Sequence, residues 1–171
     1  MAVLEDEMAD LREFIEYEFE NPEEYLRDHG YFRSPDKIRS FIRKHGFWAL
    51  NSIITSIKAG NLSEKYAKET MEMIAWTSDL DDECKNYFNA FLGNMLSHQS
   101  WVMRYSAAEC MAVDCDPTHL SSLTGALVQE KVRDVIERII ETINLVVAKQ
   151  SEVRDIIFIT REFKITNKKG V

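Results

Sequence analysis

The sequence predicts an all-α protein of about six to eight antiparallel helices, and three observations support this prediction. Apolar residues recur at steps of three and four residues along most of the chain, which is the period of an amphipathic helix. The three prolines stand near predicted helix starts, and none interrupts an apolar pattern. A length of 171 residues with 45% hydrophobic content suits a single helical domain, which we place at residues 1–150.

The first predicted helix, residues 1–20, is amphipathic and strongly acidic. Its apolar residues, from Leu4 to Ile15, follow helical spacing. Residues 1–30 hold eleven acidic side chains and two arginines, a balance of −9, so the rest of a chain with net charge −8 carries +1. An acidic surface steers a basic protein toward it, although a solvated surface that keeps the chain soluble is the favoured interpretation of a run of charges. The candidate partner-binding carboxylates here are Glu13, Glu16, Glu20, Glu23 and Glu24.

Start and stop signals divide residues 36–148 into packed helix pairs. Serine and aspartate cap helix starts, proline fits the first turn, and glycine adopts the left-handed conformation at helix ends. The signals of these kinds are Ser34-Pro35-Asp36, Gly46, Gly60, Ser63, Asp81 and Asp116-Pro117. Residues 21–35, which contain Asn21-Pro22, are expected to form a connector, since the residue before proline is disfavoured in a helix.

The longest apolar pattern lies in residues 132–147. Its members are Val132, Val135, Ile136, Ile139, Ile140, Ile143, Val146 and Val147. The helix before it has the apolar residues Leu120, Leu123, Leu127 and Val128. Residues 151–171 fit either a helix or a strand, because their apolar residues match both periods. We favour a helix followed by a frayed basic end that contains Arg161, Lys164, Lys168 and Lys169.

Two segments share a pattern of an apolar residue, an arginine and small or aliphatic residues. The first is Met103, Arg104, Ala107, Ala108 and Met111, and the looser second is Val132, Arg133, Ile136 and Ile140. This pattern resembles the HEAT family of helical repeats, over about residues 98–148. The resemblance implies a short α-solenoid in which small residues allow close helix packing and Arg104 lies at the seam between units. An irregular helical bundle is the alternative.

Three tryptophans and one arginine are further candidates for partner binding. Trp48, Trp76 and Trp101 stand on separate predicted helices and could line a concave surface together with Tyr87 and Phe91. Core packing is the favoured interpretation of these aromatic residues, because their spacing is helical. Arg104 could bind an acidic group on a partner, although the structural seam is favoured for it too.

The Cys110/Cys115/His119 region offers an enzymatic alternative. Thiolate and imidazole ligands suit zinc if Cys84 or His98 completes the set, but the spacing is poor and buried free thiols are favoured. The acidic sets Glu69 with Glu72, and Asp134 with Glu137 and Glu141, are expected to face solvent. The chain has no glycine-rich phosphate loop or nucleophile elbow, so we predict no catalysis, no metal and no cofactor.

Charge and hydropathy also limit the functions that the chain could have. The chain has no domain-wide basic excess, which argues against nucleic acid as a partner. It has neither a signal-like N-terminus nor a membrane-length apolar run, and its three cysteines form no disulfide framework, so we expect a cytoplasmic protein. We therefore predict a non-enzymatic protein-binding scaffold, for example an inhibitor or immunity protein that neutralises a basic toxin or nuclease. A self-associating structural or adaptor module is a further alternative.

Overall fold

The computed structural model describes residues 36–77 and 80–167 together with Ala9, with side chains described from Ile38 to Ser151. Within these residues the chain forms seven helices and no strand, so the all-α prediction is confirmed. The helices are α3 (Asp36–His45), α4 (Phe47–Lys58), α5 (Glu64–Ala75), α6 (Asp82–Met95), α7 (Trp101–Asp114), α8 (His119–Gln129) and α9 (Arg133–Asn167). The acidic helix predicted at residues 1–20 and the connector at 21–35 lie outside the described residues, Ala9 apart.

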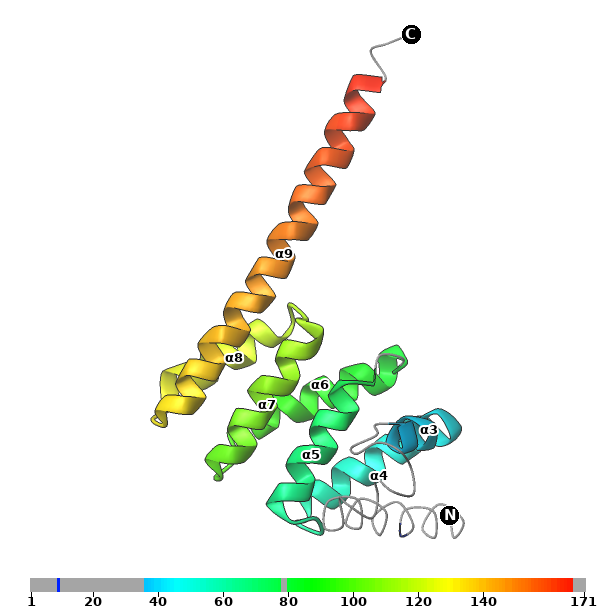
Figure 1. Ribbon diagram of the computed structural model, residues 1–171, viewed down its shortest axis with the longest axis vertical. Helices are drawn as coiled ribbons and strands as arrows, with labels where there is room; N and C mark the ends of the chain where they lie inside the picture. Colours follow the sequence, from blue (N-terminus) through cyan, green and yellow to red (C-terminus); the bar gives the residue numbers. More distant parts are fainter. Residues whose placement is uncertain (1–8, 10–35, 78–79, 168–171) are drawn as a thin grey trace, which may run out of the picture.

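The helices lie in two layers. In one layer α3 contacts α5, α5 contacts α7, and α7 contacts α9; in the other α4 contacts α6, and α6 contacts α8. Contacts of α3 with α4, α6 with α7, and α8 with α9 join the layers. Figure 1 shows α5, α7 and α9 side by side and running in the same general direction. Helix pairs stack in this order in α-solenoids, although membership of the HEAT family stays a prediction.

Several predicted helix boundaries are confirmed by their hydrogen bonds and dihedral angles. The Asp81 carboxylate accepts a hydrogen bond from the Cys84 N–H at 2.7 Å and caps α6, and the Ser63 hydroxyl accepts one from the Tyr66 N–H at 3.5 Å at the start of α5. Gly46 and Gly60 have positive φ angles of 58° and 70°, which glycine adopts without steric cost because it has no Cβ atom. These local signals mark the starts of α4, α5 and α6 and the end of α4.

The centre of α7 is packed closely against its neighbours. Ala107, Ala108 and Met111 have no exposed surface, and the buried Thr142 hydroxyl of α9 donates a hydrogen bond to the Ala108 carbonyl at 3.0 Å. Alanine at these positions allows the α7 backbone to approach the neighbouring helices, because no longer side chain stands between them.

We expect Ala108→Leu to lower the free energy of unfolding by about 1–3 kcal/mol, because the added carbons have no space between α7 and α9. Urea denaturation of both proteins would measure the difference. Ala90→Leu, on an exposed position of α6, is the matched control and should change stability by less than about 0.5 kcal/mol. Equal stability of the two variants would show that the α7 position tolerates the larger side chain.

The last helix, α9, is continuous from Arg133 to Asn167 and therefore crosses the boundary that we predicted after residue 150. Figure 1 shows its C-terminal part extending beyond the other helices. Only part of its predicted apolar face is covered, since Val135, Ile139 and Val146 are fully buried whereas Ile140 and Val147 are exposed. The end of α8 differs from expectation in the same way, because Val128 is exposed. None of the described helices has the length and apolarity needed to cross a bilayer.

Candidate functional site

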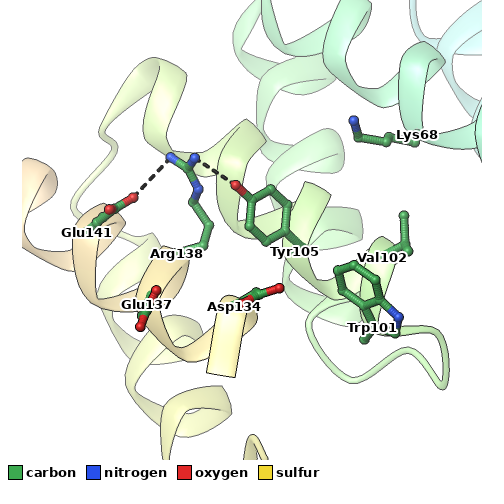
Figure 2. Close-up of a pocket in the computed structure, with 8 residues that line it drawn as sticks. All are labelled: Lys68, Trp101, Val102, Tyr105, Asp134, Glu137, Arg138 and Glu141. Carbon is green, nitrogen blue, oxygen red and sulfur yellow. Dashed lines mark hydrogen bonds and ion pairs between the residues drawn. The ribbon is translucent and has the colours of Figure 1, made fainter. Parts of the chain in front are cut away.

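A groove crosses α5, α7 and α9 and is formed by two adjoining depressions of about 450 and 470 Å³. Lys68 of α5 and Arg138 of α9 line both depressions and mark where they meet. The first depression, shown in Figure 2, is further lined by Trp101, Val102, Tyr105, Asp134, Glu137 and Glu141. The second is further lined by Glu72, Ala75, Trp76, Glu109, Cys110, Ala112 and Val113. We call the two depressions together the α5–α7–α9 groove.

Tryptophans lie at both ends of this groove. Trp101 is the first residue of α7 and Trp76 directly follows α5, and because the two helices run the same way, they mark opposite ends. Trp76 is 66% exposed and Trp101 is 47% exposed. Trp48 is 69% exposed but lies on α4, which does not line the groove.

The favoured prediction that these aromatic residues pack in the core is thus wrong for all three tryptophans. It holds for Phe91, which is buried, and in part for Tyr87, which is half-buried and donates a hydrogen bond to the Asn51 side chain at 2.6 Å. Tryptophan side chains are on average highly buried, so largely exposed ones are unusual, and large aromatic residues often anchor protein interfaces.

Arg138 holds the middle of the groove together. Its guanidinium donates a hydrogen bond to the Tyr105 hydroxyl at 2.8 Å, and its carbon Cζ lies 5.1 Å from the centre of the Tyr105 ring. It also pairs with Glu141 on α9 at 3.3 Å and with Glu109 on α7 at 3.6 Å. Figure 2 shows this arginine reaching from α9 toward Tyr105. These contacts join α7 to α9, and the two carboxylates neutralise the positive charge of Arg138.

The groove carries a net negative charge. Its described lining includes five carboxylates, Glu72, Glu109, Asp134, Glu137 and Glu141, against two cations, Lys68 and Arg138, which gives a balance of −3. Lys68 pairs with Glu72 at 3.2 Å, so the cation on α5 is also already engaged. A partner with basic groups would meet unbalanced carboxylates here.

Arg104 lies outside the groove and makes the contacts of a structural arginine. Its Nε and Nη2 donate to both oxygens of Glu130 at 2.6 and 3.0 Å, and its Nη1 donates to the carbonyls of His98 and Gln99 at 2.8 and 3.0 Å. Glu130 in turn accepts hydrogen bonds from the backbone N–H groups of Lys131 and Val132. Arg104 thereby joins the α6–α7 loop to the α8–α9 loop, and it lines a separate depression together with Glu130.

The Cys110/Cys115/His119 region shows separate structural roles for its members. Cys110 is buried, and burial raises the pKa of its thiol above the ordinary value. Cys115 ends α7 in a left-handed conformation, with φ of 51°, and its thiol donates to the Ala112 carbonyl at 3.0 Å. The buried His119 ring lies 2.9 Å from the Asp114 carboxylate. Among the described residues, no three His, Cys, Asp or Glu side chains form a group that could hold a metal ion.

The structure brings together only some of the sequence-predicted site residues. Trp76 and Trp101 share the groove, while Trp48 and Arg104 do not line it, and Glu13, Glu16, Glu20, Glu23 and Glu24 lie outside the described residues. Glu69, expected to face solvent, is buried, whereas Glu72 and the carboxylates of α9 line the groove. Sequence reasoning missed Tyr105 and Arg138. Their signal was helical spacing, since Tyr105 lies one turn after Trp101 and Arg138 shares a face with Asp134 and Glu141.

Comparison with protein-family models, with curated proteins and with solved structures finds no match to this chain. Because one fold can support many functions, the residues of the α5–α7–α9 groove have to indicate what the chain binds.

Proposed function

We propose that this chain is a non-enzymatic protein-binding scaffold whose α5–α7–α9 groove binds a basic segment of a partner protein. The observation that supports the proposal is the combination of two exposed tryptophans with an excess of carboxylates in one groove. Tryptophan supplies a large apolar contact area, and carboxylates select cationic side chains and raise the association rate.

One concrete form of this function is an inhibitor or immunity protein that covers the active surface of a basic toxin or nuclease. The acidic sequence of residues 1–30, with its balance of −9, would add to the attraction for such a partner. The groove would then supply the short-range contacts that hold the partner in place. This form places the protein and its partner in the same compartment, the cytoplasm.

Co-purification followed by a binding titration tests the proposal. The wild-type chain, a groove variant carrying Trp76→Ala and Trp101→Ala, and the control variant Trp48→Ala would each be used to capture partners from the native cell. We expect a basic partner that binds the groove variant about 30-fold or more weakly, because truncating a central aromatic contact costs about 2 kcal/mol or more. The Trp48→Ala variant should bind as the wild type does, since its equally exposed tryptophan lies on α4.

The salt dependence of the same complex provides a second test. Ionic strength of 1 M shortens the screening length to about 3 Å from about 10 Å at 0.1 M, so binding through surface charge weakens with salt. An acidic partner, binding that is indifferent to salt, or equal losses in the groove and Trp48→Ala variants would contradict the proposal.

Self-association is a second candidate function, and the exposed aliphatic residues of α9 favour it. Ile140 and Val147 lie on one face of α9, two turns apart, and both are exposed. Sedimentation of the wild type and of Ile140→Ser over a range of concentrations would detect a dimer that this face stabilises. A concentration-independent monomer would rule this function out.

A further inference from the structure

The two ends of the α5–α7–α9 groove differ in chemistry. The depression that contains Trp101 carries the exposed carboxylates of Asp134, Glu137 and Glu141, all from α9, and Glu141 lies beside Arg138 where the two depressions meet. The end at Trp76 is walled by Ala75, Ala112 and Val113, which are small or aliphatic. The groove therefore carries more negative charge in the Trp101 depression, whereas the two carboxylates of the Trp76 depression, Glu72 and Glu109, pair with Lys68 and Arg138.

The cations of the groove do not neutralise its acidic end. Lys68 pairs with Glu72, and Arg138 is shared among Tyr105, Glu109 and Glu141. Glu137 pairs with Arg133, but these side chains are 55% and 88% exposed, so the pair is weak and exchanges readily with another cation. Asp134 takes part in no ion pair that the described residues show. Negative charge consequently remains at this end beside Trp101.

A tryptophan next to carboxylates is a suitable site for a cationic side chain. The face of an indole ring attracts ammonium and guanidinium groups, and a carboxylate adds charge-assisted hydrogen bonds, for which the planar guanidinium of arginine is best matched. The Asp134 carboxylate lines the same depression as Tyr105 and Trp101 (Figure 2), and both Asp134 and Trp101 are exposed. At the other end, Trp76 and the aliphatic wall provide contact area for an apolar side chain. The carboxylates that line this depression are Glu72 and Glu109.

We infer that the groove recognises an oriented segment of a partner protein, with an arginine or lysine at the Trp101 end and an apolar side chain at the Trp76 end. This inference rests on the proposed function and adds the direction in which the segment lies. From Trp101 to Val113, α7 rises by about 18 Å, which corresponds to five or six residues of an extended segment or to about twelve residues of a helix. The partner sequence should therefore have its basic and apolar anchors at one of these separations.

The test selects ligands for the purified full chain from a phage-displayed library of random peptides of about twelve residues, the length of a helix that spans the groove. Enriched peptides would be synthesised, and their affinities for the wild type, Asp134→Asn, Trp76→Ala and the control Trp48→Ala would be measured by fluorescence anisotropy. Each peptide would also be made with its basic residue replaced by citrulline or norleucine, and with its apolar anchor replaced by alanine.

We expect Asp134→Asn to lower the affinity for the parent peptide by about tenfold. The affinity for the uncharged peptide should not change, because the substitution in the protein and the one in the peptide remove the same charge interaction. Trp76→Ala should likewise lower the affinity for the parent peptide and leave the affinity for the peptide without the apolar anchor unchanged. Trp48→Ala should bind every peptide as the wild type does.

The contrary results separate this inference from the proposed function. Coupling of the basic residue to Trp76, or coupling to neither end, would overturn the orientation while leaving a groove that binds basic peptides. A library that yields no binding peptide at all would overturn the inference too, and the partner captured from cells would still test the proposed function. Peptides that bind the Trp76→Ala/Trp101→Ala double variant as well as they bind the wild type would contradict both.

Discussion

Glu130→Gln should lower the free energy of unfolding by about 3 kcal/mol at pH 7, one of the two largest effects that we expect from a single substitution. The Glu130 side chain is only 5% exposed, and its carboxylate accepts two hydrogen bonds from the Arg104 guanidinium. Removing its charge leaves a half-buried guanidinium facing a neutral amide, and the junction between the α6–α7 and α8–α9 loops loses its strongest contact.

The pH dependence of stability should show the same interaction. Hydrogen bonds from Arg104, and to a lesser extent from the Val132 and Lys131 N–H groups, lower the pKa of Glu130 from 4.5 to about 2. Because the pKa is lower in the folded state, the stabilisation is complete above about pH 4.5 and is lost as the pH falls toward 2. The difference in free energy of unfolding between wild type and Glu130→Gln, measured by urea denaturation from pH 7 to pH 2, should shrink across this window.

A second arginine–glutamate pair of the chain supplies the control. Arg133 and Glu137 are only 2.7 Å apart but largely exposed, so Glu137→Gln should change stability by less than about 1 kcal/mol. A Glu130→Gln variant as stable as Glu137→Gln, or a difference from wild type that stays constant down to pH 2, would show that the Arg104–Glu130 pair does not stabilise the fold.

The Arg104–Glu130 pair also shows what the sequence can and cannot predict. The repeat-like pattern around Arg104 predicts a seam between repeat units, which stays a prediction, and in the structure the arginine joins two loops. Its acceptor, Glu130, lies 26 residues away in the chain, and no local pattern singles it out. Helix boundaries at Gly46, Gly60 and Asp81 depend on neighbouring residues only, and for that reason they could be predicted.

The candidate site was less accessible to prediction, because a groove is made by residues from three helices. Helical spacing identifies the apolar positions of each helix but not which of them a neighbour covers. The sequence pattern thus places Trp76 and Trp101 in the core, whereas the structure leaves both exposed at the ends of one groove. The acidic face of Asp134, Glu137 and Glu141 could be read from spacing, but its position opposite Tyr105 depends on how α9 packs against α7.

Adjacent isoleucines on α9 give the sharpest test of that packing. Ile139 and Ile140 both belong to the apolar pattern predicted for residues 132–147, and the sequence does not distinguish them. In the structure Ile139 is fully buried, whereas Ile140 is 43% exposed. Ile139→Ala should lower the free energy of unfolding by about 2–5 kcal/mol, because it removes buried methyl and methylene groups and leaves a cavity that the surrounding helices fill only in part.

Ile140→Ala removes the same atoms from the next residue of the same helix and is therefore a matched control. Its cost should be less than about 1 kcal/mol, because little buried surface is lost and alanine is the better helix former. Urea denaturation of both variants, with helix content monitored by circular dichroism, measures the difference. Equal losses of unfolding free energy would mean that Ile140 is also covered, for instance by a second copy of the chain. In that case, repeating the denaturation at lower protein concentration would reduce the effect of Ile140→Ala and leave that of Ile139→Ala unchanged.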